Sequence, residues 1–314
     1  MTVIALGSIN VDFQMTVDQW PQPGGAMHGR DFTVAGGGKA ANVALFACRA
    51  NVPAILLGQV GDDWLAKIAL KNLESACANL SFVRHSRAGT GAAFVITGPH
   101  ADKIITMAGN ANMDWDEQAI AAAVSAVNSA GEGSVLVADL EVPPGVVEAT
   151  ARAARDRGLK VVIDPSPAEC MTPALYELAD VLTPNPSEAR HLSGVEVEDR
   201  EAATRAAESI RMKAGGAAVF VKLQHGDCLV LADERATYLR ALPIKAVDTT
   251  GAGDAFAAAT AIGLGDARPI AECALLGMAG ASIAVRSYGA QASYKDRAAL
   301  DTCFRELMRR NPMR

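Results

Sequence analysis

The chain has 314 residues, a length that suits one large α/β domain or two modest ones. Half of the residues are hydrophobic but only 5% are aromatic, so Ala, Val, Leu and Ile must build the core, which suits helices packed on a parallel sheet. The formal net charge is −6 and no basic stripe is present, which argues against a nucleic-acid partner.

Nothing in the sequence predicts a membrane partner. The longest apolar runs, 255–264 and 274–285, are too short to span a bilayer, and no basic region precedes the first strand-like run. Six cysteines are scattered without a C-x-x-C pair, which favours reduced thiols over disulfides or a zinc site. We therefore expect a cytoplasmic protein.

The first third of the chain combines β–α–β units with two β-excursions. The apolar run 3–6, which ends at Gly7, predicts a central strand. Segments 12–34 and 85–107 alternate around turns and predict a small second sheet, with a hairpin turn at 98–102 in the second segment. The other elements expected here are a helix at 39–50, a strand at 54–58 and a helix at 62–76.

Farther along, strands and helices alternate regularly. This alternation implies parallel crossovers and a doubly wound, mainly parallel sheet with helices on both faces, in a single domain over 1–314. The expected strands are 135–138, 160–164, 181–183, 219–223 and 228–232, and the expected helices are 144–157, 173–178, 186–192, 200–213 and one that begins at 255.

Segment 248–256, D-T-T-G-A-G-D-A-F, joins a glycine-rich turn to an acid and an apolar helix. The backbone N–H groups of Gly251, Ala252 and Gly253 would point outward at the helix start, whose partial positive charge attracts phosphate. Bound phosphate would repel Asp254, so this acid suits a general base that takes a proton from an attacking hydroxyl. In an isolated G-A-G-D, an acid that only stabilises the helix end would be the better interpretation.

The full string resembles the carboxy-terminal signature of the ribokinase family, also called the PfkB family of carbohydrate kinases. The resemblance covers nearly the whole chain and implies a ribokinase-like fold with the two β-excursions as a lid. It implies ATP-dependent phosphorylation of a primary hydroxyl of a small sugar, with ribose as the first candidate. It also implies that Asp254 is the catalytic base and that Gly251, Ala252 and Gly253 form an anion hole. Lids in this family often pair between subunits, which implies a homodimer.

A second motif and two strand-end residues indicate where the sugar binds. Segment 36–42, G-G-G-K-A-A-N, fits neither a P-loop nor a dinucleotide fingerprint, and alone it predicts only a flexible turn before a helix. It is similar to the family motif G-G-K-G-A-N, with Ala40 in place of the usual glycine. Asn10 and Asp12 alternate just past the first strand, where ligands bind in open α/β sheets, although turn chemistry would explain them equally well. The resemblance implies sugar contacts from Asn10, Asp12, Gly37, Gly38, Lys39, Asn42, Glu141 and Asp254.

Two further segments predict where the nucleotide binds. Asn185 and Glu188 resemble the family's N-x-x-E element, which orders water around Mg²⁺ and the phosphates, and the same pair also predicts a helix cap. Segment 221–227 takes the place of the nucleotide loop but has Gln224 and Asp227 where glycines are common, which is the clearest departure from the family. The resemblance implies ATP contacts from Asn185, Glu188, Lys222, Gln224 and Gly253.

Segment 282–293 resembles the part of the family that completes a monovalent-cation site. Oxygen ligands without soft donors suit K⁺ better than a transition metal, and a surface turn is the alternative. Carried over by position, the cation ligands are Asp248, Thr250, Ala284, Ser287, Gly289 and Ser293.

The acceptor stays open at this stage. Alternatives to ribose are a nucleoside, fructose or a keto-deoxy sugar acid, because pocket geometry decides such differences. A sugar acid would need a positive charge such as Arg30. A non-catalytic sugar-binding protein is less favoured because the signature at 248–256 is intact. A nucleoside would need an apolar pocket under the lid, for which the chain offers Phe13, Met15, Phe94 and Met107.

Overall fold

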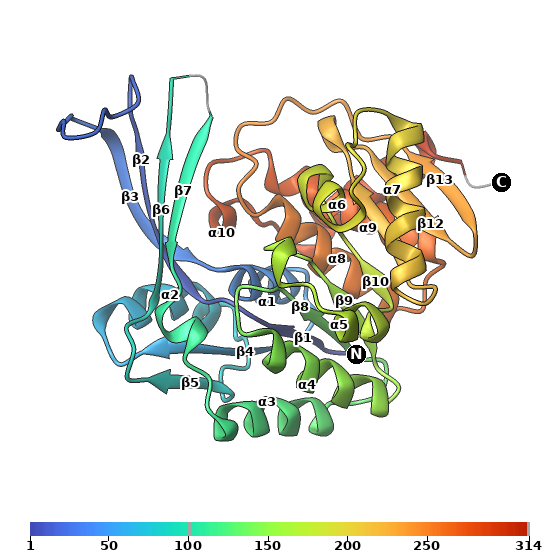
Figure 1. The fold of residues 1–314 in the computed structure, drawn as a ribbon, viewed down its shortest axis with the longest axis horizontal. Helices are drawn as coiled ribbons and strands as arrows, with labels where there is room; N and C mark the ends of the chain where they lie inside the picture. The colour runs from blue at the N-terminus through green and yellow to red at the C-terminus, as the bar shows by residue number, and fades with distance from the viewer. Residues whose placement is uncertain (100–101, 313–314) are drawn as a thin grey trace.

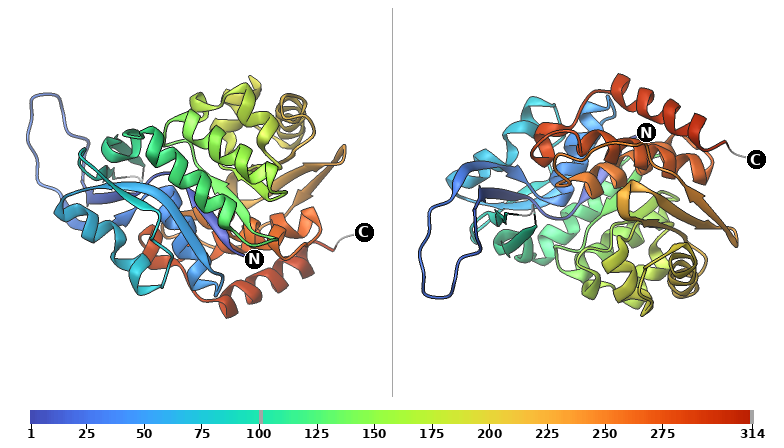
Figure 2. Two further views of the ribbon diagram at one scale, coloured as in Figure 1. Left: turned by 90° about the horizontal axis from the view of Figure 1, so that it is seen from below. Right: turned by 90° about the horizontal axis from the view of Figure 1, so that it is seen from above.

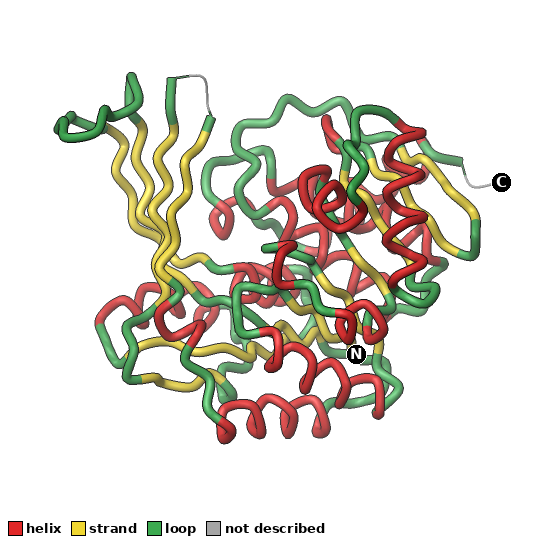
Figure 3. The backbone as a smooth tube through the Cα atoms, in the orientation of Figure 1, coloured by secondary structure: helices red, strands yellow, loops and turns green. Residues whose placement is uncertain are grey.

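A computed structural model describes residues 1–99 and 102–312 of the chain. It consists of a large α/β body and a small sheet that stands away from it as a lid (Figures 1 and 3). The expected hairpin turn at 98–102 includes His100 and Ala101, which lie outside the described residues. None of the helices in the described part of the chain is long and apolar enough to cross a membrane.

Within residues 1–99 and 102–312, nine strands form the main sheet in the order β13-β12-β11-β10-β9-β8-β1-β4-β5. The pairs from β5 to β11 are parallel, whereas β12 and β13 add an antiparallel edge. The strands are β1 (Val3–Leu6), β4 (Ala54–Gly61), β5 (Val83–Ser86), β8 (Val135–Ala138), β9 (Lys160–Ile163), β10 (Val181–Leu182), β11 (Ala218–Lys222), β12 (Cys228–Ala232) and β13 (Arg235–Leu239).

Helices cover both faces of this sheet because its strands are apolar on both sides (Figure 2). In β1, Val3 and Ala5 pack toward one helix layer, and Ile4 and Leu6 pack toward the other. The first layer is α1 (Lys39–Arg49), α2 (Trp64–Ser75), α8 (Ala252–Gly265), α9 (Ile270–Ala284) and α11 (Arg297–Arg310), and the second is α3 (Glu117–Ser129), α4 (Pro144–Asp156), α5 (Pro173–Leu178), α6 (Pro186–Ser193) and α7 (Arg200–Lys213).

The lid is a four-stranded sheet in the order β3-β2-β6-β7. It begins at Asn10, slightly earlier than the expected residue 12. Its second half begins at Gly91 rather than 85, because residues 83–86 pair with β4 as an edge strand of the main sheet. The lid strands are β2 (Asn10–Thr16), β3 (Arg30–Gly37), β6 (Gly91–Thr97) and β7 (Lys103–Ala108).

Candidate active site

The candidate site lies where the carboxyl ends of the central strands meet the starts of two helices and the base of the lid. Asp139 directly follows β8, and Asp164 directly follows β9. Lys39 is the first residue of α1, and Asp254 lies in the first turn of α8. The topology thus brings residues from distant parts of the sequence to one edge of the sheet, where open α/β folds bind ligands.

Asp254 is a buried acid at a helix start. Burial raises its pKa to about 6, although Lys39 and a hydrogen bond from Asn42 act in the opposite direction. Asn42 Nδ2 donates that bond to Asp254 Oδ2 over 2.7 Å. A carboxyl group with this pKa can accept and return a proton near neutral pH, as a general base must.

The turn before α8 presents amides at the helix start. Gly251 has φ = 75°, a left-handed conformation that favours glycine, and its carbonyl accepts a hydrogen bond from Tyr294 Oη over 3.0 Å. The Ala252 amide donates to the Thr249 carbonyl over 3.2 Å. The amides of Gly251 and Gly253 have no such protein partner within the described residues. They are therefore available to an anion at the positive end of α8.

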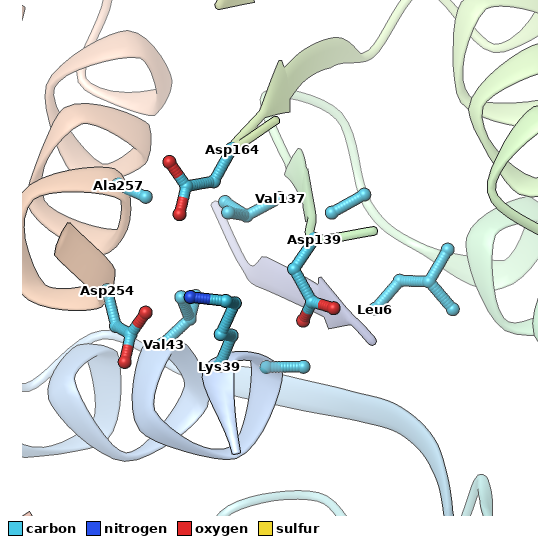
Figure 4. Close-up of a pocket in the computed structure, with 10 residues that line it drawn as sticks. Leu6, Lys39, Val43, Val137, Asp139, Asp164, Asp254 and Ala257 are labelled. Carbon is cyan, nitrogen blue, oxygen red and sulfur yellow. The ribbon is translucent and has the colours of Figure 1, made fainter. Parts of the chain in front are cut away.

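The Lys39 ammonium lies among several carboxylates, and Figure 4 shows it between Asp139, Asp164 and Asp254. Burial alone would lower the pKa of Lys39, but the nearby acids, led by Asp254 and Glu141, raise it well above its usual range. Burial and Glu141 together raise the pKa of Asp139. Lys39 therefore stays charged and offsets part of the negative potential around Asp254.

Three of the expected sugar-binding residues are held in place by neighbours. Asn112 Nδ2 donates to Asn10 Oδ1 over 2.7 Å. Ser8 Oγ donates to Glu141 Oε2 over 2.6 Å, and Lys39 Nζ lies 3.8 Å from Glu141 Oε1. Burial, with Asp254 and Glu141 nearby, raises the pKa of Asp12 to about 7. These contacts hold the Glu141 carboxylate and the Asn10 side-chain amide in place.

Two glycines of the second motif lie close to strand β2 and to the turn that precedes it. A Cβ on Gly37 would lie 2.3 Å from Asp12 Oδ1, so a side chain at Gly37 would displace this acid. A Cβ on Gly38, which has φ = 93°, would lie 2.5 Å from the Ser8 carbonyl oxygen. The structure thus places Gly37 against Asp12, and Gly38 against the turn that leads to Asn10.

The two faces of the lid differ in chemistry. Strand alternation puts Asn10 and Asp12 on the face toward the site, together with Met107 opposite Asp12 through β6. Phe13 pairs across the lid with Phe94, and their rings stack with centroids 5.1 Å apart. These rings and Met15 alternate along the strands with the residues on the face of Asp12, so they belong to the opposite face. Of the four side chains proposed for a nucleoside pocket, only Met107 shares the face of Asp12.

A cavity of about 980 Å³ on the other side of α8 provides a nucleotide-sized space. Lys222 Nζ lies 2.7 Å from Asp164 Oδ1, so its ammonium is held at the end of the sheet. Glu188 does not line this cavity and instead forms a capping box with Asn185 at the start of α6. The cavity lining includes four of the five expected ATP-binding residues, Asn185, Lys222, Gln224 and Gly253.

Asp227, the other departure in the nucleotide loop, serves the loop itself. It accepts hydrogen bonds from the Tyr238 hydroxyl and, over 2.7 Å, from the Ala241 amide. His225 adopts φ = 59° in the same turn. Asp227 therefore joins the β11–β12 turn to the segment after β13, while Gln224 remains exposed to the cavity.

The expected cation ligands are only partly brought together. Asp248 accepts from the amides of Thr250 and Gly289, each over 3.0 Å. Ser293 Oγ donates to the Ala290 carbonyl within α10 (Ala290–Ser293). Ala284 ends α9, and no hydrogen bond from the Ser287 side chain is seen within the described residues. An unexpected residue, Lys103 of the lid, contacts both Asp248 and Thr250.

Sequence reasoning missed Asp139, Asp164, Asn112 and Lys103. The two aspartates could have been found, because each directly follows a short apolar strand of a predicted parallel sheet. No local pattern marks Asn112 or Lys103, whose partners are far away in sequence.

Comparisons with known proteins show the family and the fold of the chain. Residues 2–297 match the family described as pfkB family carbohydrate kinase. The ribokinase of Haemophilus influenzae is 30% identical over 297 residues, which cover 94% of this chain and 96% of that protein. The deoxyribokinase of Salmonella typhi is 28% identical over 299 residues, covering 94% and 95%. Arabidopsis thaliana ribokinase, solved in complex with ribose and ATP, superimposes with a TM-score of 0.83 at 25% identity, covering 96% of this chain and 98% of that one. The predicted family and fold class are confirmed, and the chain belongs to the pfkB family of carbohydrate kinases.

Proposed function

We propose that this protein transfers the γ-phosphoryl group of ATP to a primary hydroxyl of a small neutral sugar, with ribose as the first acceptor. The observation that carries the proposal is the position of Asp254 beside the amides of Gly251 and Gly253, which have no hydrogen-bond partner among the described residues, at the start of α8. The base and the anion-binding amides are then adjacent, as phosphoryl transfer to a hydroxyl requires.

In the proposed reaction, the Asp254 carboxylate takes the proton of the sugar hydroxyl. The hydroxyl oxygen forms a bond to the γ-phosphorus while the bond from that phosphorus to the β,γ-bridging oxygen breaks, and ADP leaves. Amides at the start of α8 stabilise the charge on the transferred group. Lys222 lies on the same side, since its Nζ is 3.5 Å from where a Cβ of Gly253 would stand.

Mg²⁺ fits the acidic groups beside the nucleotide cavity. Burial and the nearby Asp164 raise the pKa of Glu188, so these two acids form a region where an added cation would be favourable. We propose that Asn185, Glu188 and Asp164 hold Mg²⁺ through water, because Mg²⁺ usually keeps several of its waters. Bound there, the ion would neutralise phosphate charge.

Charge and hydrogen bonding support a neutral sugar over the alternatives. Asp254, Glu141, Asp164 and Asp139 lie near the Lys39 ammonium, and Asp12 lies near Asp254 and Glu141, so a carboxylate substrate would meet mostly acidic groups. Arg30, the candidate partner of a sugar acid, instead pairs with Asp18 and Asp31 in the lid. An unpartnered acceptor suits a sugar hydroxyl, since Asn42 Oδ1 is buried and has no hydrogen-bond partner within the described residues.

We also propose a homodimer formed through the outer face of the lid, and a cytoplasmic location. The outer face exposes Val34, Phe94 and Ile104, an apolar surface of the kind that marks an interface. The six cysteines are free thiols, which is typical of a reducing compartment.

The test is ADP release with Mg-ATP and a panel of ribose, 2-deoxyribose, fructose, a keto-deoxy sugar acid and adenosine. We expect ribose to give the highest kcat/KM, with Asp254→Asn as the matched control because Asn has nearly the same shape. That variant should lose about 10²-fold or more of kcat, the usual scale for general-base loss. A preference for adenosine or the sugar acid would reject the proposed acceptor. Near-normal turnover by Asp254→Asn would reject the proposed base.

A further inference from the structure

A lysine of the lid reaches the turn that leads to the anion-binding amides. Lys103, the first residue of β7, is the only lysine in the four lid strands. Its Nζ lies 2.6 Å from Asp248 Oδ1 and 2.7 Å from Thr250 Oγ1. In Figure 1, β7 is the lid strand next to the loop that precedes α8. This contact joins the lid to the main body across 145 residues of sequence.

Both oxygens of the Asp248 carboxylate accept hydrogen bonds in this arrangement. Its Oδ1 accepts from Lys103, from the Thr250 amide and from the Thr250 hydroxyl, and its Oδ2 accepts from the Gly289 amide. The Asp248 side chain is only 6% exposed, so its negative charge needs a compensating cation. Lys103 supplies one positive charge at the oxygens where the sequence predicts K⁺. A K⁺ ion at the same oxygens would lie beside an ammonium and be repelled, so the described donors do not fit both cations.

We propose that Lys103 is a built-in replacement for the monovalent cation, and that phosphoryl transfer by this protein therefore does not need K⁺. The inference rests on the proposed kinase function. Thr250 is followed directly by Gly251 and the start of α8, so the charge on Asp248 fixes the turn that orients the anion-binding amides. Because β7 carries the ammonium, this charge is in place only when the lid is near the body. Lys103 thereby acts as a positioning residue for the anion site.

The experiment measures kcat and KM for ribose and ATP in choline chloride and in KCl at matched ionic strength. The wild type should change by less than about twofold between the two salts, because its own ammonium fills the site. Lys103→Met should lose roughly tenfold or more in choline chloride, below the loss seen when a direct oxyanion donor is removed. K⁺ or NH₄⁺ should restore much of that loss, chiefly in kcat.

Arg30→Met is the matched control, since it also removes a lid cation. Arg30 pairs with Asp18 and Asp31, which both belong to the lid segment. The kcat and KM of this variant should therefore be the same in choline chloride and in KCl. A wild-type requirement for K⁺ that is unchanged in Lys103→Met would overturn the proposal. So would a Lys103→Met variant that K⁺ fails to restore.

Thermal melting separates this inference from the kinase proposal. In Lys103→Met, KCl should raise the melting midpoint above that in choline chloride by about 2 °C or more, as expected for a bound ion, while the wild type should show no K⁺-specific shift. If no sugar on the panel is phosphorylated but this shift appears, the cation inference stands and the kinase proposal falls. If Lys103→Met does not fold, Lys103→Arg keeps the charge and should remain independent of K⁺. A K⁺-specific shift in the wild type or in Lys103→Arg would count against the inference.

Discussion

Asp254 and Asp12 are buried carboxyl groups whose pKa values lie close to neutrality. Burial raises the pKa of Asp254 to about 6 and that of Asp12 to about 7, and Glu141 adds to both shifts. A general base near neutral pH is effective because it is mostly ionised yet still basic enough to take a proton. The cost is that part of each group is protonated, and inactive, just below pH 7.

The first prediction concerns the pH dependence of the kinase reaction. Asp254 must be ionised to accept a proton, so kcat/KM should fall as pH decreases through about 7 to 6. Glu141→Gln removes a negative neighbour that raises both pKa values, so its acid limb should move to lower pH. The measurement is kcat/KM for ribose between pH 5 and 9 in a buffer of constant ionic strength, roughly 0.1 M to limit changes in screening. A profile that is flat from pH 5 to 8, or a Glu141→Gln limb at higher pH, would contradict it.

The second prediction is that Asp12 lowers the stability of the fold. Its pKa is about 7 in the folded protein, against 3.8 for an ordinary aspartate, so the folded state binds more protons between these values and loses stability as pH rises. Asp12→Asn should therefore raise the free energy of unfolding at pH 7.5 by roughly 1–2 kcal/mol while impairing sugar binding. Urea denaturation gives the comparison. The gain should shrink as pH falls toward 4, and a loss of stability at pH 7.5 would refute the argument.

At the scale of elements, the start of α8 contains two glycines with different roles. Gly251 has φ = 75°, and a Cβ there would lie 2.5 Å from Ala290 Cβ and 2.6 Å from Tyr294 Oη. For Gly253, the nearest atom to an added Cβ is Lys222 Nζ at 3.5 Å, which is an ordinary contact. Gly251 thus serves the fold, and Gly253 keeps the approach to the amides open for phosphate.

This difference gives the third prediction. Gly251→Ala should lower the free energy of unfolding by about 1–3 kcal/mol, from backbone strain and overpacking. Gly253→Ala should leave stability within about 0.5–1 kcal/mol of the wild type, since Ala also favours the helix. It should still lower kcat/KM for ATP about tenfold or more, because its methyl group stands where the anion approaches. Urea titrations and kinetic measurements on both variants test this prediction. Equal losses of stability in the two variants would disprove the assignment of different roles to Gly251 and Gly253.

The strands and helices of the body could be predicted from the sequence because the hydrophobic residues of each element recur with one period over its length. Lys39–Arg49 and Trp64–Ser75 lie within one or two residues of the expected helices. The strand Val83–Ser86 was missed because its sequence, V-R-H-S, carries no apolar alternation and its pairing is supplied by β4 alone. A short edge strand is determined by its neighbour rather than by its own residues.

At the scale of the whole molecule, the motifs located the candidate catalytic residues but not the contacts that join distant segments. The segment 248–256 marked Asp254 and the anion turn because local geometry dictates both. The pairing of Lys103 with Asp248 depends on how the lid sits over the body, and no local pattern encodes that position. The face of the lid on which Phe94 lies also depends on the register of the sheet, since a shift by one residue exchanges the two faces of a strand.

The lid register leads to the fourth prediction, on assembly. Phe94 and Ile104 are 49% and 50% exposed on the outer face, whereas Ile105, which is 56% exposed, is one residue out of step and belongs to the face toward the site. If the outer face pairs with a second copy, Phe94→Asp should convert a dimer to a monomer, because a buried charge in an apolar interface is costly. Ile105→Asp is the matched control and should remain dimeric.

Light scattering after size-exclusion chromatography measures the mass of each variant directly. A monomeric wild type at micromolar concentration would reject the lid dimer, and dissociation by Ile105→Asp alone would assign the interface to the wrong face. The lid also carries Asp12 and Lys103, so its position affects both the sugar site and the turn before α8. Dissociation by Phe94→Asp should therefore raise KM for the sugar as well, since the unpaired lid gains freedom that sugar binding must then restrict.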